Sequence, residues 1–131
     1  MKSVDGLVEA YLDGLAHSDL PAVLGLFADE AVVHSPLYGS LPPADFYPAL
    51  FADTAQARLE LRGTMRGRSV TGAELLSFWF RFDWRLTSGV WAPFEVVDVA
   101  ELDEDGAIRS LWIVYDTVDV RTAYTESTHH S

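Results

Sequence analysis

Residues 78–102 read FWFRFDWRLTSGVWAPFEVVDVAEL, and this stretch decides the fold. Its side chains alternate in character, as in a β-strand, where successive residues point to opposite faces of the sheet. Before the turn, one face carries Phe78, Phe80, Phe82, Trp84 and Leu86, and the other carries Trp79, Arg81, Asp83 and Arg85. After the turn, one face carries Val90, Ala92, Phe94, Val96, Asp98, Ala100 and Leu102. The pattern predicts a β-hairpin with one apolar face.

The register of this hairpin depends on its turn. A three-residue turn over 87–89, with its glycine left-handed, places Leu86 opposite Val90 and puts the two apolar sets on the same face. Arg81 then lies opposite Glu95 as a cross-strand charge pair. We favour this register because it buries the aromatic side chains and pairs the charges.

The alternative is a two-residue turn at Ser88 and Gly89. It would slip the register by one residue and send Arg81 and Asp83 inward. In the favoured register Asp98 points inward instead, among phenylalanines.

The rest of the chain predicts helices first and strands after. Apolar residues at three- and four-residue intervals predict one helix near the N-terminus, with Tyr11 facing inward, and a second that Asp19 caps. A short strand, 31–35, and a third helical segment with Pro48 follow. Period-two patterns then predict strands near 57–67, 73–86, 90–102 and 107–118. This is an α+β layout, in which the helices pack on a strongly bent antiparallel sheet and form a cone around a pocket.

Composition limits the possible partners and compartments. The 131 residues predict a single domain over 1–124 and a flexible tail over 125–131, in which the adjacent His129 and His130 lack a third metal ligand. With 9 basic and 20 acidic residues, the net charge of -11 argues against nucleic-acid and anionic-membrane partners. The acidic residues of the first helix argue against a signal peptide or membrane span, so we expect a cytoplasmic protein. No cofactor and no metal are expected.

The stretch YLDGLAHSDLPAVLGLFADEAVVHSPLYG, residues 11–39, resembles without a gap the opening of the ketosteroid isomerases. These belong to the nuclear-transport-factor-2-like superfamily, together with SnoaL-like polyketide cyclases and limonene epoxide hydrolases. VVDVAELDEDGAI, residues 96–108, matches more loosely, through the spacing from Asp98 to Gly106. The resemblance implies the cone-shaped fold of that superfamily. Function does not follow from it, because this fold serves isomerases, cyclases, hydrolases and non-catalytic pockets.

Carried over by position, the resemblance makes Tyr11 and Asp98 an oxyanion-hole pair. It also implies a neutral Asp98 that donates a hydrogen bond. The residues agree, because a lone carboxyl on a buried strand face must be protonated or paired. The alternative is that Tyr11 and Asp98 only bond each other across the core.

Ser35 occupies the position of the isomerases' carboxylate base. A serine hydroxyl cannot take a proton from carbon near neutral pH without a base of its own. His34 has suitable chemistry, but neighbours on a strand face opposite sides, so only a bulge at Pro36 would turn it inward. We favour a surface or dimer-face role for His34.

A second resemblance concerns limonene epoxide hydrolase. RFD, residues 81–83, is similar to the arginine-x-aspartate pair that positions its water. The match needs the slipped register, and the second aspartate of that site corresponds to the apolar Ile113.

The expected pocket is apolar and aromatic, the usual makeup of a small-molecule site. With a four-residue turn at residues 103–106, Leu111 would lie opposite Asp98, and Ile113 and Tyr115 would continue the same face. The predicted lining is Phe78, Phe80, Phe82, Trp84, Phe94, Val96, Leu111, Ile113 and Tyr115. A core filled by these side chains is the alternative.

Two functions remain open for such a pocket. The chain is either an isomerase- or cyclase-type enzyme acting on a small hydrophobic molecule without a carboxylate base, or a non-catalytic binding domain. We also expect a homodimer through the outer face of the sheet, where an apolar patch needs a cover. That patch comprises Trp79, Trp91, Val97, Val99 and Trp112.

Overall fold

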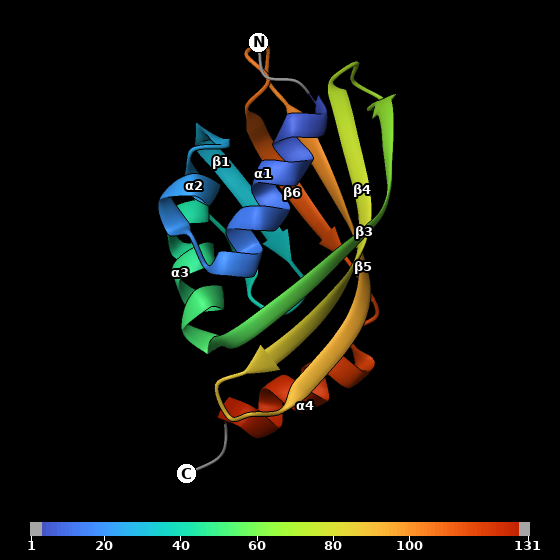
Figure 1. Ribbon diagram of the computed structural model, residues 1–131. Coiled ribbons are helices and arrows are strands. Elements are labelled where there is room, and N and C mark those ends of the chain that lie inside the picture. Colours follow the sequence, from blue (N-terminus) through green and yellow to red (C-terminus); the bar gives the residue numbers. More distant parts are fainter. Residues whose placement is uncertain (1–3, 129–131) are drawn as a thin grey trace.

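The computed structural model describes residues 4–128, and its secondary structure confirms the α+β layout (Figure 1). The helices are α1 (Val4–His17), α2 (Leu20–Leu24), α3 (Pro43–Asp53) and α4 (Val118–Thr128). The strands are β1 (Phe27–Ser35), β2 (Gly39–Leu41), β3 (Thr54–Arg68), β4 (Glu74–Leu86), β5 (Trp91–Leu102) and β6 (Ile108–Val114). The strands form one six-stranded sheet in the order β2-β1-β6-β5-β4-β3.

The β4–β5 hairpin has the register that the sequence favours. The Leu86 backbone N–H donates to the Val90 carbonyl at 2.8 Å, and Gly89 takes a left-handed φ of 93°, which closes the three-residue turn. Arg81 lies opposite Glu95, and Phe78 lies opposite Asp98. Asp98 therefore points to the buried face.

The sheet is mixed rather than wholly antiparallel. β1 and β6 run parallel, whereas every other neighbouring pair is antiparallel. A parallel pair needs a long crossover between its strands, and here α3 and four strands intervene. The short edge strand β2 lies between the predicted strand over 31–35 and the third helical segment, where the sequence predicts no strand.

The β5–β6 register differs by two residues from the prediction. Asp98 lies opposite Ile113, and Leu111 lies opposite Ala100. The turn has one residue more than expected, because the Asp103 N–H bonds the Ala107 carbonyl, and a register shift next to Glu101 adds another. The total shift is two residues. Because side chains along a strand alternate between the two faces, Leu111 and Ile113 still face inward as predicted.

The helices α1, α2 and α3 lie on the concave side of a bent sheet (Figure 1). β3 carries two register shifts against β4, one of them at Gly63, and such bulges bend a strand and increase its twist. Gly14 of α1 has no room for a side chain, because an added Cβ would lie 2.5 Å from a methyl of Val23. The two helices therefore pack closely where they cover the sheet.

Helix α4 replaces the end of the last predicted strand. β6 ends at Val114, and α4 begins at Val118, whose N–H bonds the Asp116 carboxylate at 3.0 Å. Its valines and threonines have modest helix propensity, so the local sequence does not predict a helix, and the burial of Val120 in the core supplies the stability. The helix continues past the predicted domain boundary at residue 124. The tail histidines at 129 and 130 lie outside the described residues.

Over residues 4–128, no helix combines the length and the apolar character that a membrane crossing requires. The outer face of the sheet exposes indole rings, with Trp79 42%, Trp91 43% and Trp112 38% exposed. Guanidinium groups flank two of them, because Arg62 lies 6.0 Å from the ring centroid of Trp79, and Arg85 lies 5.9 Å from that of Trp91. Tryptophan and arginine are the residues that contribute most at protein interfaces.

We expect a second copy of the chain to cover this face. Light scattering should report a homodimer at tens of micromolar, an order of magnitude for a stable interface. Trp112→Glu should shift the protein to a monomer, because two introduced carboxylates would meet across a symmetric interface. The control is Val70→Glu, in the fully exposed β3–β4 turn, which should leave the dimer intact. A wild-type monomer at this concentration would contradict the expectation.

Candidate functional site

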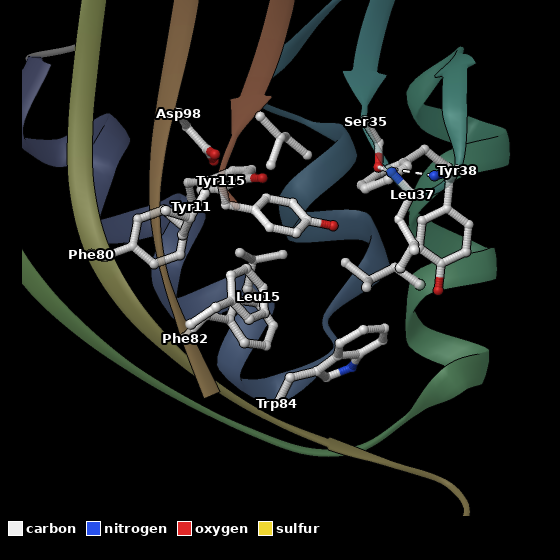
Figure 2. A pocket seen from close by; sticks show the side chains of 15 residues that line it. Tyr11, Leu15, Ser35, Leu37, Tyr38, Phe80, Phe82, Trp84, Asp98 and Tyr115 are labelled. Atoms are coloured by element: carbon white, nitrogen blue, oxygen red, sulfur yellow. Dashed lines mark hydrogen bonds between the residues drawn. The ribbon is translucent and has the colours of Figure 1, made fainter. Parts of the chain in front are cut away.

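A cavity lies between the inner face of the sheet, α1, α3 and the loop after β1 (Figure 2). Its lining is mostly aromatic and aliphatic: Tyr11, Leu15, Ser35, Leu37, Tyr38, Phe46, Leu50, Phe80, Phe82, Trp84, Phe94, Val96, Asp98, Ile113 and Tyr115. Its volume is about 50 Å³. One water needs roughly 10–15 Å³, and an engineered cavity of about 150 Å³ binds benzene. The cavity therefore has room for a few waters, and a ring compound requires its walls to move.

The cavity contains every predicted lining residue except Phe78 and Leu111. Both are fully buried in the core cluster and do not reach the open space. Phe82 stacks on Phe94 with 5.3 Å between ring centroids, and Phe94 lies 4.6 Å from the ring of Tyr115. The inner face of the hairpin thus forms a continuous aromatic wall, and the role of these residues in ligand binding stays a prediction.

Asp98 is a buried carboxyl in this wall. Its side chain is 1% exposed, and its Oδ1 has no hydrogen-bond partner within residues 4–128. Burial raises the pKa of Asp98 well above its ordinary value, and the Tyr11 hydroxyl only partly offsets this effect. Burial therefore favours the protonated form of Asp98, which can donate a hydrogen bond.

Tyr11 projects from α1 toward Asp98 and is held by a second tyrosine. Its hydroxyl lies 2.8 Å from that of Tyr47 on α3, and its ring makes an edge contact with Phe78. Burial raises the pKa of Tyr11, and Tyr47 and Asp98 raise it further. The structure thus brings Tyr11 and Asp98 together as predicted. Tyr47 was not predicted as a site residue, because helical periodicity on α3 indicates only that it is buried.

Ser35 ends β1 at the far side of the cavity from Asp98 (Figure 2). Its Oγ accepts hydrogen bonds from the backbone N–H groups of Leu37 at 3.2 Å and Tyr38 at 3.1 Å. These bonds fix the turn that carries the loop into β2. Ser35 therefore has a structural task that the sequence did not reveal.

A second group of polar contacts lies where α3 meets the loop. The Tyr38 hydroxyl donates to Asp53 at 2.6 Å, and the Trp84 indole N–H donates to Thr54 at 2.8 Å. Tyr124 of α4 stacks on Trp84 and makes an edge contact with Tyr38. Helix α4 thereby covers this end of the cavity, a contribution that sequence periodicity did not predict.

The other predicted polar residues lie outside the cavity. His34 faces outward, where its ring stacks on Trp112 with 5.0 Å between centroids and its Nδ1 lies 2.9 Å from Ser40 Oγ. Arg81 pairs with Asp83 at 2.9 Å on the same outer face. His34 therefore cannot reach a ligand in the cavity. Arg81 and Asp83 cannot position a water there, which removes the basis of the epoxide-hydrolase resemblance.

The cavity holds hydrogen-bond donors and lacks an evident base. Among the lining side chains only Asp98 carries a carboxyl, and none is a histidine. A neutral carboxylic acid and a tyrosine in an apolar site can stabilise negative charge that develops on a ligand oxygen. Within residues 4–128, no cluster of three or more histidine, aspartate or glutamate side chains could hold a metal ion.

Comparison with known proteins identifies the family and the fold of the chain. A family model described as "SnoaL-like domain" matches residues 8–111. None of the curated proteins matches the sequence.

Solved structures share the architecture over almost the whole chain. An NTF2-like protein of unknown function from Burkholderia pseudomallei is 18% identical, with a TM-score of 0.79 over 95% of this chain and 99% of that chain. A putative polyketide cyclase from Pseudomonas putida is 15% identical, with a TM-score of 0.64 over 97% and 98%. TerC, crystallised with polyporic acid, is 15% identical, with a TM-score of 0.72 over 97% and 98%. At these identities the likeness shows a common fold.

The raised pKa of Asp98 predicts a specific dependence of stability on pH. The folded state keeps the Asp98 proton, whereas the unfolded chain loses it above about pH 4. Rising pH therefore destabilises the wild type until it passes the folded-state pKa. Relative to wild type, Asp98→Asn should gain up to about 1.4 kcal/mol of unfolding free energy per pH unit in this window.

Urea unfolding at several pH values between 4 and 8 measures this difference. The matched control is Asp29→Asn, an exposed position on β1, which should show no such trend. A constant difference between Asp98→Asn and wild type across the range would mean that Asp98 ionises in the folded protein as it does in water.

Proposed function

The chain belongs to the SnoaL-like domain family, and from this premise we propose that it is an enzyme that binds a small, largely apolar molecule and stabilises negative charge on its oxygen through Asp98 and Tyr11. The observation that carries the proposal is the state of Asp98. It is buried beside a tyrosine, its burial favours the neutral form, and one of its oxygens has no partner among the described residues. A carbonyl, enol or phenol oxygen of a ligand would supply that partner.

The contact with Tyr47 supports a catalytic arrangement of Tyr11. Either hydroxyl of the pair can be the donor, and when Tyr47 donates, the Tyr11 proton is directed to Asp98 or to a ligand oxygen. Both tyrosines have raised pKa values, mainly because they are buried. They therefore remain neutral donors, and a charge that builds up on the ligand oxygen stays on the ligand.

Proton transfer at carbon is the step for which the site has no strong group. Ser35 stands where the ketosteroid isomerases carry a carboxylate, and its Oγ already accepts two backbone hydrogen bonds. The chemistry that fits is enolisation or ring closure in which water or the substrate itself takes the proton. Oxyanion stabilisation and proton abstraction are separable, and this site supplies the first.

A second candidate function is ligand binding without catalysis. The observation in its favour is the same use of Ser35, because a residue that fixes a loop is not a base. Exchange of α-protons of a small cyclic ketone into D₂O distinguishes the two functions. An enzyme should accelerate the exchange in an Asp98-dependent way, whereas a binding domain should leave the rate unchanged.

Binding of a simple phenol tests the oxyanion pair. We expect 4-ethylphenol to bind in the cavity, and Asp98→Leu and Tyr11→Phe each to weaken it by about 1–3 kcal/mol, the usual size of a lost buried hydrogen bond. Calorimetric titration measures this loss. The matched control is Asp83→Leu on the outer face, which should bind like wild type. If neither cavity variant changes the affinity, the pair is only part of the core.

Isomerisation tests the missing base. The wild type should have negligible activity as a Δ5-3-ketosteroid isomerase, and on a single-ring β,γ-unsaturated ketone it should show only the slow, Asp98-dependent rate that water as the base allows. Ser35→Asp should raise the rate on the small ketone, since it adds a carboxylate at that position. Ser35→Asn, which cannot act as a base, is the control. Efficient turnover by the unaltered protein would require a base elsewhere in the chain.

A further inference from the structure

We propose that the ligand carries a second oxygen, a carbonyl across an aromatic or enolic ring from the first, and that the Ser35 hydroxyl donates a hydrogen bond to it. This inference rests on the proposed function, which places the first oxygen at Asp98 and Tyr11. It assigns to Ser35 a ligand contact in place of the proton-transfer role that its position suggests.

The hydrogen bonds that Ser35 already makes leave its hydroxyl able only to donate one further hydrogen bond. A serine hydroxyl has one donor and two acceptor sites. Both acceptor sites of Ser35 are taken, by the backbone N–H groups of Leu37 and Tyr38. Within residues 4–128, the hydroxyl makes no hydrogen bond as a donor. Because the other directions around Oγ are occupied, the turn also fixes where the proton can point.

The position of this proton indicates what it serves. Ser35 is 9% exposed and belongs to the cavity lining, so water satisfies it poorly. A buried donor without an acceptor costs about 1–3 kcal/mol. A ligand carbonyl at this side would remove that cost, and a hydroxyl whose lone pairs are occupied accepts no hydrogen bond from a ligand. The site therefore selects an acceptor oxygen here.

Two other polar side chains of the lining are already engaged. The Tyr38 hydroxyl donates to Asp53, and the Trp84 indole donates to Thr54. Burial raises the pKa of Tyr115 to about 12, Arg121 partly offsets this effect, and its hydroxyl stays a neutral group of the lining. Figure 2 shows Asp98 and Ser35 on opposite sides of the space. Polar groups with unused hydrogen-bonding capacity on opposite sides of a largely aromatic space match a hydroxyaryl ketone or a hydroxyquinone.

Two single-ring ligands distinguish the hydrogen bond of Ser35 from a general change in the structure of the loop. 4-Hydroxyacetophenone has a phenol and a carbonyl across the ring, and 4-ethylphenol has the same phenol without the carbonyl. Calorimetric titration of both into wild type, Ser35→Ala, Ser35→Thr and Asp98→Leu gives the affinities. Damage to the loop should weaken both probes equally, whereas a lost bond to the carbonyl should weaken only the ketone.

We expect Ser35→Ala to weaken 4-hydroxyacetophenone about tenfold more than 4-ethylphenol, which is the effect of one hydrogen bond. Ser35→Thr, which keeps the hydroxyl, should restore the wild-type ratio of the two affinities. An equal effect of Ser35→Ala on both probes, or no binding of the ketone up to its solubility, would overturn the inference. If Asp98→Leu still weakens both probes, the proposed function survives that result. If Asp98→Leu weakens neither, the proposed function itself fails.

Discussion

The three-residue turn between β4 and β5 is the constraint on which the rest of the structure depends. Strand side chains alternate between the two faces of the sheet. A turn one residue shorter would therefore place the apolar side chains of one strand on the same face as the polar side chains of the other. The hydrogen bond from Leu86 to Val90, with Gly89 in the left-handed region, fixes the register that sends Asp98 inward. The aromatic wall, the neutral carboxyl and the outward direction of Arg81 all follow from it.

The sequence predicted this part well because the hairpin encodes its register locally. Alternation defines its faces, a glycine identifies the turn, and Arg81 opposite Glu95 confirms the alignment. Tyr11 and His34 were placed correctly for the same reason, since periodicity alone decides which way a helix or strand residue faces. The β5–β6 register was less accurate, because its bulge leaves no mark in the residue pattern.

What the sequence could not provide is contact between distant segments. The bond between Tyr11 and Tyr47 joins two helices, and the stacking of Tyr124 on Trp84 joins α4 to β4. Neither contact is implied by propensity, and α4 itself is a helix because of what it packs against. The same limit applies to Ser35, where the residue type rules out a strong base but only the loop geometry reveals that both of its acceptor sites are taken.

The small cavity constrains how a ligand could enter. The sheet wall is braced by hydrogen-bonded strands and stacked rings, so its aromatic side chains have little freedom to move apart. Helix α4 packs behind Tyr38 and Trp84 through the ring of Tyr124, with Val120 buried in the core and a hydrogen bond of 2.5 Å from Arg121 to the Pro36 carbonyl. It makes far fewer contacts than the paired strands do. Low local contact density marks the parts of a protein that open most easily. The extra volume that a ring compound needs is therefore most cheaply gained at α4, which leaves the Asp98 end fixed while the Ser35 end adjusts to the length of the ligand.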